Sequence, residues 1–401
     1  RRAAAQHLGN APSREFPALG TFCAERARAL SRYAEVRVLV PTPWFPSWLP
    51  ARGGWRRWAR VEREGRTAEG VPVVYPRYLS IPKVATWSQG IATAWSVGRA
   101  FRRRYGGWRP DVVDGHFAFP DGYAAVRLAQ ALGCRSLVTC HGSDLLRYPP
   151  LPITSAMLRW TLRTADRVIS VSSALRDESV RLGCPADKAV FLTNGVDPGQ
   201  FQVRDAGECR RRLDLPAERR IAVCVGYLID RKNQSVLIRA LAELRRQGRQ
   251  PPYLVLVGEG PNLGLLQDEA RRLGVGDSVR FVGQRPYDEI PYWIGAGDWL
   301  VLSSHYEGWA TVYFEAMACG RPVLTSNVSA APDAVSSSDY GIVVEPNTPA
   351  AFAQALRDAQ ASAFDPQRIR RYAEQHSWDN WARSLIAIID SPSPPEGRGP
   401  G

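Results

Sequence analysis

The sequence predicts an α/β protein built from two doubly wound domains with parallel sheets. The chain has 401 residues, which is more than one hydrophobic core usually supports, so two domains are expected. Its composition, 45% hydrophobic and 23% charged, is typical of globular proteins and unlike disordered or disulfide-scaffold chains. Short apolar runs alternate with segments of helical period, and this repetition implies parallel sheets covered on both faces.

The first half of the chain contains five apolar runs that indicate buried strands. They cover residues 36–40, 112–113, 136–139, 167–171 and 189–192. Helices are expected between them, near residues 21–32, 120–132, 153–164 and 173–182. Residues 1–19 contain no hydrophobic run. Either the first strand of this domain is missing, as the assignment below assumes, or residues 1–19 are poorly ordered.

The second half repeats the pattern with six apolar runs. These cover residues 221–226, 253–257, 279–282, 299–302, 322–325 and 341–344. The expected helices lie near residues 234–247, 262–273, 286–295, 311–319 and 348–360. Doubly wound sheets bind ligands at the carboxyl ends of their strands, so the site is expected in a cleft between the two domains.

Turn-forming residues mark the domain boundary. Asn194-Gly195 and Asp197-Pro198-Gly199 are strong turn sequences that follow the last strand of the first half. The first domain is therefore assigned to residues 1–197 and the second to residues 198–376. Residues 391–401 are rich in Pro, Gly and Ser, and this tail is expected to be disordered.

The net positive charge of the chain lies entirely in its first half. Residues 1–197 hold 29 Lys and Arg against 15 Asp and Glu, whereas the remainder holds 23 against 24. This asymmetry indicates an anionic partner for the first domain, such as a membrane surface, a lipid phosphate or a nucleic acid. Only three of the basic residues are lysines, and Lys232 is one of them.

The cysteines argue for a cytoplasmic protein. There are seven, scattered and without a C-x-x-C pair, so neither a disulfide framework nor a structural zinc site is expected. No signal peptide is recognisable, and no apolar run is long enough to span a bilayer.

The stretch 303–325, SSHYEGWATVYFEAMACGRPVLT, carries the strongest chemical signal. Glu307 follows a predicted strand, and Glu315 lies on the next predicted helix. The amides of Ala310, Thr311 and Val312 would form the start of that helix, where phosphate groups bind readily. Glu315 could accept hydrogen bonds from a cis-diol such as ribose, and Glu307 could reach a hydroxyl on a sugar beyond the phosphates. The plain alternative is a surface helix with two solvated carboxylates.

This stretch resembles the signature of the family four retaining glycosyltransferases, which have the GT-B fold of two Rossmann-like domains. The pattern E-G-x6-E-A-M-A-C-G-x-P-V runs from Glu307 to Val323. Further segments resemble the family's other motifs and follow in the family's order. They are His141-Gly142-Ser143-Asp144, Asn194-Gly195-Val196-Asp197, Gly226-Tyr227-Leu228 with Arg231-Lys232, Gly258-Glu259-Gly260-Pro261, and Phe281-Val282-Gly283.

The resemblance implies transfer of a sugar from a nucleotide-diphosphate donor to an acceptor, with retention of anomeric configuration, in polysaccharide or glycolipid synthesis. It implies catalytic roles for His141, Arg231, Lys232 and Glu307. Lys232 would contact the donor phosphates, and Arg231 would supply the second cation because Tyr227 stands where the family usually has Arg. The remaining residues implied to bind the donor are Gly20, Asp144, Gly226, Gly258, Val282, Ala310, Thr311, Val312 and Glu315.

Metal independence is expected because the chain contains no Asp-x-Asp sequence to hold a divalent ion. Side-chain cations and helix amides would then stabilise the departing diphosphate. The resembled fold also ends with a helix that returns to the first domain. Residues 377–390 fit that helix, since Trp378, Trp381, Leu385 and Ile388 offer an apolar face at helical spacing.

Two alternative functions, and two interpretations of the Trp and Arg segments, stay open at this stage. A nucleotide-sugar epimerase or hydrolase would use a similar donor cleft on the same fold. A nucleic-acid-binding protein would explain the pI of about 9.7, although no helix-turn-helix, zinc or RNA-binding motif is present. The segments 55–60 and 87–109 interleave Trp and Arg as interfacial membrane segments do, but a core-packed helix with a solvated arginine end fits the second of them equally well.

Overall fold

The computed structural model describes residues 2–7, 20–44, 58, 60–67, 70–80 and 86–392. The expected disorder of the tail 391–401 falls almost wholly outside these residues. Of the Trp and Arg segment 55–60, residues 58 and 60 lie within them and the others lie outside. The chain divides into two compact units. Unit 1 comprises residues 1–194 and 378–401, and unit 2 comprises residues 195–377. The boundary lies three residues before the expected one, in the same turn-rich segment.

Unit 1 contains an eight-stranded sheet in the order β10-β9-β8-β7-β1-β2-β5-β4, parallel except for β4. Its strands are β1 (Arg2–His7), β2 (Ala34–Leu39), β4 (Glu64–Arg66), β5 (Pro72–Val74), β7 (Val112–His116), β8 (Arg135–Cys140), β9 (Arg167–Ser170) and β10 (Ala189–Phe191). A separate parallel pair is formed by β3 (Thr42–Trp44) and β6 (Arg77–Leu79).

The prediction of a missing first strand is wrong. β1 lies inside the sheet, where it pairs in parallel with β2 on one side and β7 on the other. Its sequence RAAAQH lacks the β-branched and aromatic residues that favour strands. Backbone pairing with two neighbours, which no local pattern displays, overrides that weak propensity.

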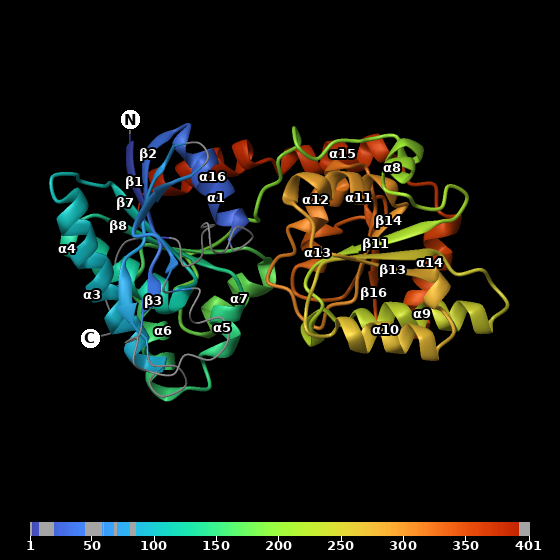
Figure 1. Ribbon diagram of the computed structural model, residues 1–401. Coiled ribbons are helices and arrows are strands. Elements are labelled where there is room, and N and C mark those ends of the chain that lie inside the picture. The colour runs from blue at the N-terminus through green and yellow to red at the C-terminus, as the bar shows by residue number, and fades with distance from the viewer. Residues whose placement is uncertain are drawn as a thin grey trace. The chain divides into compact units, whose positions relative to one another are not determined.

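The helices of unit 1 cover both faces of its sheet (Figure 1). They are α1 (Thr21–Ser31), α3 (Thr86–Tyr105), α4 (Tyr123–Leu132), α5 (Ser143–Arg147), α6 (Pro152–Thr164), α7 (Ser173–Arg181) and α16 (Trp378–Asp390). One core cluster joins α1 and α16 to Val112 of β7, and another joins α3 and α4 to Val113. Adjacent valines enter opposite clusters because successive side chains of a strand point to opposite faces.

Residues 377–390, expected to return to the first domain, lie in or next to α16. Trp378, Trp381 and Leu385 are buried in the same core cluster as Cys23 and Leu30 of α1. Because α16 completes the cover over this face of the sheet, the last helix of the chain is part of unit 1.

Unit 2 contains a six-stranded parallel sheet in the order β13-β12-β11-β14-β15-β16. Its strands are β11 (Ile221–Val225), β12 (Tyr253–Val257), β13 (Val279–Gly283), β14 (Trp299–Leu302), β15 (Val323–Ser326) and β16 (Gly341–Val344). Its helices are α8 (Ala206–Arg212), α9 (Gln234–Arg246), α10 (Leu263–Arg272), α11 (Ile290–Ala296), α12 (Val312–Ala318), α13 (Ala331–Ala334), α14 (Pro349–Ala361) and α15 (Pro366–Gln375). Figure 1 shows α9 and α10 on one face of this sheet and α11, α12 and α15 on the other.

The predicted fold class of two doubly wound α/β units is confirmed. All six strands expected in the second half are present within a residue or two of their predicted limits. The first half is less regular, because β3 to β6 are three-residue strands, too short for a pattern to reveal.

Candidate active site

The order of strands in unit 2 selects one place for a ligand. Chain order runs outward from β11 through β12 to β13, and then from β14 through β15 to β16 on the other side. β11 and β14 are neighbours, so the connections that follow them diverge to opposite faces. A crevice outside the carboxyl ends of such a strand pair is where doubly wound sheets bind ligands.

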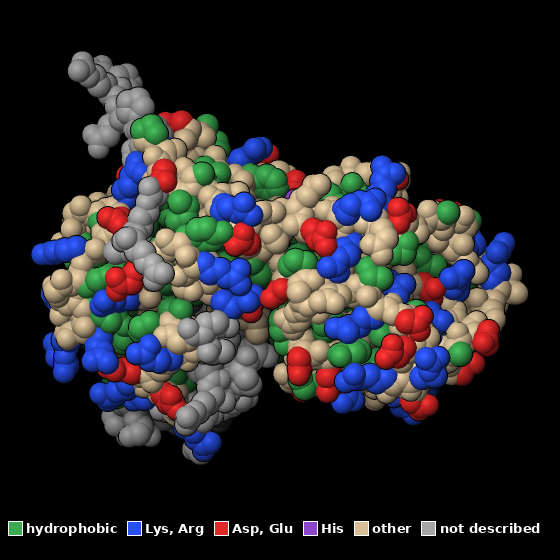
Figure 2. Space-filling model, turned by 90° about the horizontal axis from the view of Figure 1, so that it is seen from above, with side chains coloured by type: hydrophobic (Ala, Val, Ile, Leu, Met, Phe, Trp, Pro, Cys, Tyr) green, Lys and Arg blue, Asp and Glu red, His purple; other side chains and the backbone are tan. Residues whose placement is uncertain are grey.

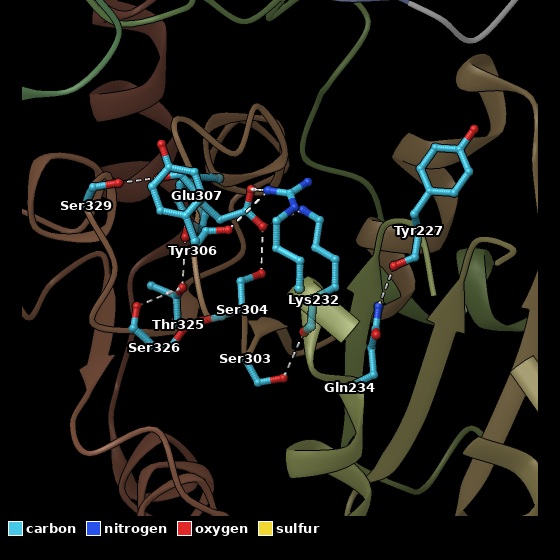
Figure 3. A network of polar contacts seen from close by, with 12 residues as sticks. Tyr227, Lys232, Gln234, Ser303, Ser304, Tyr306, Glu307, Thr325, Ser326 and Ser329 are labelled. Atoms are coloured by element: carbon cyan, nitrogen blue, oxygen red, sulfur yellow. Dashed lines mark hydrogen bonds and ion pairs between the residues drawn. The ribbon is translucent and has the colours of Figure 1, made fainter. Parts of the chain in front are cut away.

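Three predicted catalytic residues meet at this switch point (Figure 3). Lys232 and Arg231 lie on the 3-10 turn Asp230–Lys232 after β11, and Glu307 lies in the loop after β14. Lys232 Nζ is 2.5 Å from Glu307 Oε1, and Arg231 Nη1 is 3.2 Å from Oε2. Glu307 is 3% exposed, so two cations hold one buried carboxylate at the ends of the strands.

A network of hydroxyl groups fixes the Glu307 loop (Figure 3). Ser304 Oγ donates a 2.6 Å hydrogen bond to Glu307 Oε1, and Ser329 Oγ donates to the Glu307 carbonyl. The carbonyl of Ser304 accepts hydrogen bonds from Ser326 Oγ and Asn347 Nδ2. With its loop held from β15 and β16, Glu307 has little freedom to leave the two cations.

The predicted glycines bring neighbouring backbones close together. A Cβ atom on Gly258, which follows β12 with φ +146°, would lie 2.1 Å from the carbonyl oxygen of Gly226, which follows β11. The Gly258 amide also donates to the carbonyl of Gly283, next to the predicted donor-binding residue Val282. Only glycine permits this approach. The ends of three strands therefore meet in one place.

The start of α12 supplies the remaining predicted residues of unit 2. Thr311 precedes the helix, Ala310 and Val312 are buried, and the first amides of a helix have no acceptor within it. Glu315, in the first turn, accepts a 2.9 Å hydrogen bond from the hydroxyl of Tyr287. Glu315 is 6% exposed and the Lys232 side chain 14%, because each lies against polar partners in the folded loops.

His141 lies at the corresponding edge of unit 1. It follows β8, and its ring packs against Phe22, Phe117 and His116 with centroid distances of 5.0, 4.7 and 5.4 Å. Burial, followed by the charges of His116 and Arg26, holds the pKa of His141 well below its usual range. Gly20, at the start of α1, has φ +70°, a conformation that favours glycine.

Asp144 does not present its carboxylate to a ligand. It is 1% exposed, and its oxygens accept hydrogen bonds from the amides of Ala118 and Gly142, both at 2.7 Å, and from that of His141 at 3.1 Å. Burial raises the pKa of Asp144, and these amides partly offset the rise. Asp144 therefore positions the His141 loop through backbone amides, whereas the resemblance implied that it binds the donor.

Sequence reasoning missed a buried polar cluster beneath His141. His116 Nδ1 lies 3.2 Å from His141 Nε2 and 3.3 Å from Arg26 Nη1, while its Nε2 lies 3.2 Å from Asp114 Oδ2. Arg26 and His116 are fully buried. Burial alone would raise the pKa of Asp114. The pKa nevertheless lies below its usual range, because the contacts with His116, Arg26 and Thr139 outweigh burial. The sequence signal was only a histidine at a strand end, and nothing local pointed to Arg26.

The low pKa of His141 predicts acid sensitivity. A histidine whose folded pKa lies below its unfolded value of about 6.5 binds more protons when unfolded, so stability falls as pH drops below about 6.5. The expected slope is up to about 1.4 kcal/mol per pH unit for each such histidine, and burial lowers the pKa of His376 as well. Urea unfolding between pH 5.5 and 8 measures the slope. It should become shallower in His141→Asn and stay unchanged when the exposed His305 is replaced by Asn.

The structure thus brings Arg231, Lys232 and Glu307 into direct contact and sets Gly226, Gly258 and Val282 at adjoining strand ends. Gly20, His141 and Asp144 belong to unit 1. The supporting residues Ser304, Ser329, Asn347 and Tyr287 were not predicted. Among the described residues, no group of three or more His, Cys, Asp or Glu is arranged to hold a metal ion.

Comparisons with known proteins identify the family of this chain. A family model described as glycosyl transferases group 1 matches residues 205–376, and one described as Glycosyltransferase Family 4 matches residues 19–200. One relative is named as the teichuronic acid biosynthesis glycosyltransferase TuaC of Bacillus subtilis. It is 28% identical to this chain over 92% of this chain and 88% of its own length. A GDP-mannose-dependent alpha-(1-6)-phosphatidylinositol monomannoside mannosyltransferase of Mycobacterium tuberculosis is 31% identical over 68% of this chain and 74% of its own.

Solved structures show the same fold. Sucrose-phosphate synthase from Thermosynechococcus elongatus superposes with a TM-score of 0.77 at 20% identity, covering 96% of this chain and 98% of its own. Anabaena HepE in complex with UDP-glucose superposes with a TM-score of 0.72 at 19% identity, covering 97% of this chain and 100% of its own. With two family models that together span both units, and with these relatives, the chain belongs to the group 1 glycosyltransferases and has the GT-B fold.

Proposed function

We propose that this glycosyltransferase moves a sugar from a nucleotide-diphosphate donor to an acceptor, with retention of configuration and without a metal ion. The observation that carries the proposal is the contact of Lys232 and Arg231 with Glu307 at the switch point of unit 2. Two fixed cations at the ends of parallel strands suit a diphosphate, whose negative charge grows as the glycosyl bond breaks. The base and the sugar of the donor stay open.

The proposed retaining route requires only the groups at hand. The bond between the anomeric carbon and the donor phosphate breaks, the acceptor oxygen forms the new bond on the same face, and the acceptor's proton passes to the departing phosphate oxygen. No protein base is needed on the opposite face. His141, held neutral by burial, would act as a hydrogen-bonding group that orients the sugar.

Product analysis tests this function. With donor and acceptor present, proton NMR should show a glycoside whose anomeric configuration equals that of the donor. Without acceptor, the donor should persist. Rapid donor loss without acceptor would favour a hydrolase, an altered sugar on the intact nucleotide would favour an epimerase, and an inverted product would contradict retention.

Full activity is expected in excess chelator. The motivation is the absence of an Asp-x-Asp sequence together with the Arg231-Lys232 pair, which would supply the positive charge that a divalent ion provides elsewhere. Initial rates are compared with and without millimolar EDTA after passage over a chelating resin. A rate that vanishes with EDTA and returns with magnesium or manganese would contradict metal independence.

The acceptor is proposed to be a carbohydrate or a lipid-linked carbohydrate, as the names of the relatives suggest. Unit 1 would then meet a membrane surface. Figure 2 shows apolar and basic side chains mixed over the face of unit 1 that it draws. Exposed apolar side chains in unit 1 include Ile91, Leu146, Leu151 and Ile153. Of the described helices, none combines the length and the apolar character needed to cross a bilayer.

The protein is expected to bind anionic vesicles reversibly. Each basic side chain near an anionic surface contributes about 1 kcal/mol, so a few suffice for weak attachment. In flotation assays the bound fraction should be large with phosphatidylglycerol vesicles at low salt, should fall as salt rises, and should be small with phosphatidylcholine alone. Equal recovery with both lipids, or none at low salt, would leave the basic charge a role in solubility only.

A further inference from the structure

Unit 1 contains an arginine-rich pocket that the donor chemistry does not use. Its volume is about 460 Å³. The pocket is lined by the end of β5, the start of β4 and the C-terminal half of α3. Its lining includes five arginines, Arg63, Arg77, Arg99, Arg103 and Arg104, but one carboxylate, Glu64. We call it the arginine pocket.

The arginine pocket lies at the ligand-binding edge of its sheet. Val74, which lines it, is the last residue of β5, and β5 runs parallel to β2, β1 and β7. His116 is the last residue of β7, at the same edge, and contacts His141. The pocket therefore lies beside the carboxyl end of β5, on the side from which doubly wound sheets receive ligands.

Most of its arginines have no counter-ion. Within the part of the chain that the structure describes, the side chains of Arg63, Arg99 and Arg103 have no hydrogen bond or ion pair, and Arg104 pairs with Glu64 at 2.9 Å. Arg77 donates to the carbonyl of Val61. Unpaired guanidinium groups gathered around one hollow repel each other unless an anion joins them.

Another arginine-lined pocket, in unit 2, shows that this arrangement is not a general consequence of an arginine-rich sequence. It holds about 390 Å³. Arg219 there donates to Ser278 Oγ, Arg220 pairs with Asp298, and Arg357 donates to Gln247 Oε1. Three of the four guanidinium groups of that pocket are therefore satisfied by the protein. Among the described residues, only the fourth, Arg249, has no side-chain hydrogen bond or ion pair, whereas three guanidinium groups of the arginine pocket are left for a ligand.

An exposed tryptophan in the lining of the arginine pocket indicates which kind of molecule carries the anion. Trp95 lines the pocket although it is 65% exposed, and the Arg99 guanidinium lies 5.6 Å from the centre of its ring. An exposed indole offers a flat apolar face on which a sugar ring can pack. Arginine forks match the geometry of phosphate and carboxylate groups.

We propose that the arginine pocket binds the acceptor through an anionic group, a phosphate or a carboxylate carried on a sugar. The proposal rests on the proposed function, since it assigns the acceptor to unit 1 and the donor to unit 2. The anionic sugar packs on Trp95, and Arg99 and Arg103 hold its charge.

Calorimetric titration at fixed ionic strength tests the pocket, with glucose 6-phosphate and glucuronate as anionic probes and glucose as the neutral one. Both anionic probes should bind and glucose should not. Arg99→Gln and Arg103→Gln should each weaken binding about five-fold, the upper range for an exposed ion pair, and Trp95→Ala should weaken it too. Arg102→Gln is the matched control, because Arg102 is exposed on the same helix but does not line the pocket. Equal weakening by Arg102→Gln, or none by the other variants, would overturn the proposal.

Two further measurements are made on the same variants. Vesicle binding distinguishes a lipid phosphate from an anionic sugar, and nucleotide binding tests the donor site independently of the pocket. If Arg99→Gln and Arg103→Gln lower binding to phosphatidylglycerol vesicles but not to the soluble probes, the pocket takes its phosphate from a lipid headgroup and not from an anionic sugar, which would overturn the proposal. UDP and GDP binding should be unchanged in both variants. A wild-type chain that binds neither nucleotide would refute the proposed donor site, while the probe titrations would still decide whether the pocket binds anions.

Discussion

Replacing Lys232 by alanine is expected to lower kcat by about 10²–10³-fold, the effect of removing one preorganised group that stabilises a developing oxyanion. The Lys232 ammonium is fixed 2.5 Å from Glu307, at the end of β11. Arg231 and Ser304 still hold Glu307 after the change, so the loop should keep its structure. Steady-state rates with purified protein, together with circular dichroism to check folding, measure the effect.

Two variants serve as controls for this result. Lys188→Ala removes a half-buried lysine of unit 1, whose Nζ donates to the carbonyl of Arg163, and should leave the rate unchanged. Lys232→Arg keeps the charge but replaces a compact ammonium by a wide planar fork, so it should restore only part of the activity. Near-normal turnover in Lys232→Ala would refute the assignment of the phosphate site.

Replacing Glu315 by glutamine is expected to raise the KM for the donor by about 10- to 150-fold, which corresponds to the loss of a hydrogen bond to a charged group of about 1.5–3 kcal/mol. The carboxylate lies in the first turn of α12 and is oriented by the Tyr287 hydroxyl. Glutamine keeps the volume of this buried side chain, so no cavity forms. Kinetics at varied donor concentration give the KM.

Matched substitutions isolate this effect. Glu208→Gln changes an exposed carboxylate of the same unit and should leave the KM unaltered. Tyr287→Phe removes only the hydroxyl that orients Glu315, and a smaller rise in KM is expected. A normal KM in Glu315→Gln would show that this carboxylate does not bind the donor.

The alternation of strands and helices could be predicted from the sequence because buried parallel strands are continuous apolar runs. β11, β12 and β14 are such runs, as the segments IAVCV and YLVLV show. β1 could not be predicted in this way, since its alanines are held in the sheet by pairing on both sides rather than by their own preference. The short strands β3 to β6 likewise depend on tertiary contacts.

Some residues of the candidate site could likewise be predicted from the sequence, and others could not. The family motif identified Lys232, Arg231 and Glu307, and the structure brings them together because β11 and β14 are neighbours in the sheet. Asp144 shows the limit of motif reasoning, because spacing cannot tell a carboxylate that faces a ligand from one bonded to backbone amides. Arg26 contacts His116 over a separation of 90 residues, and no local pattern reveals such a pair.

The donor's diphosphate is proposed to bind at the cations Lys232 and Arg231, beside Glu307. The most direct measurement is the melting temperature of the wild type, Lys232→Ala and Lys188→Ala with and without UDP or GDP, since a ligand of the folded state stabilises it by about 2.7 kcal/mol at 100 times its Kd. One nucleotide should raise the melting temperature of the wild type and of Lys188→Ala, and should raise that of Lys232→Ala much less. An equal rise in all three proteins, or no rise with either nucleotide, would contradict the claim.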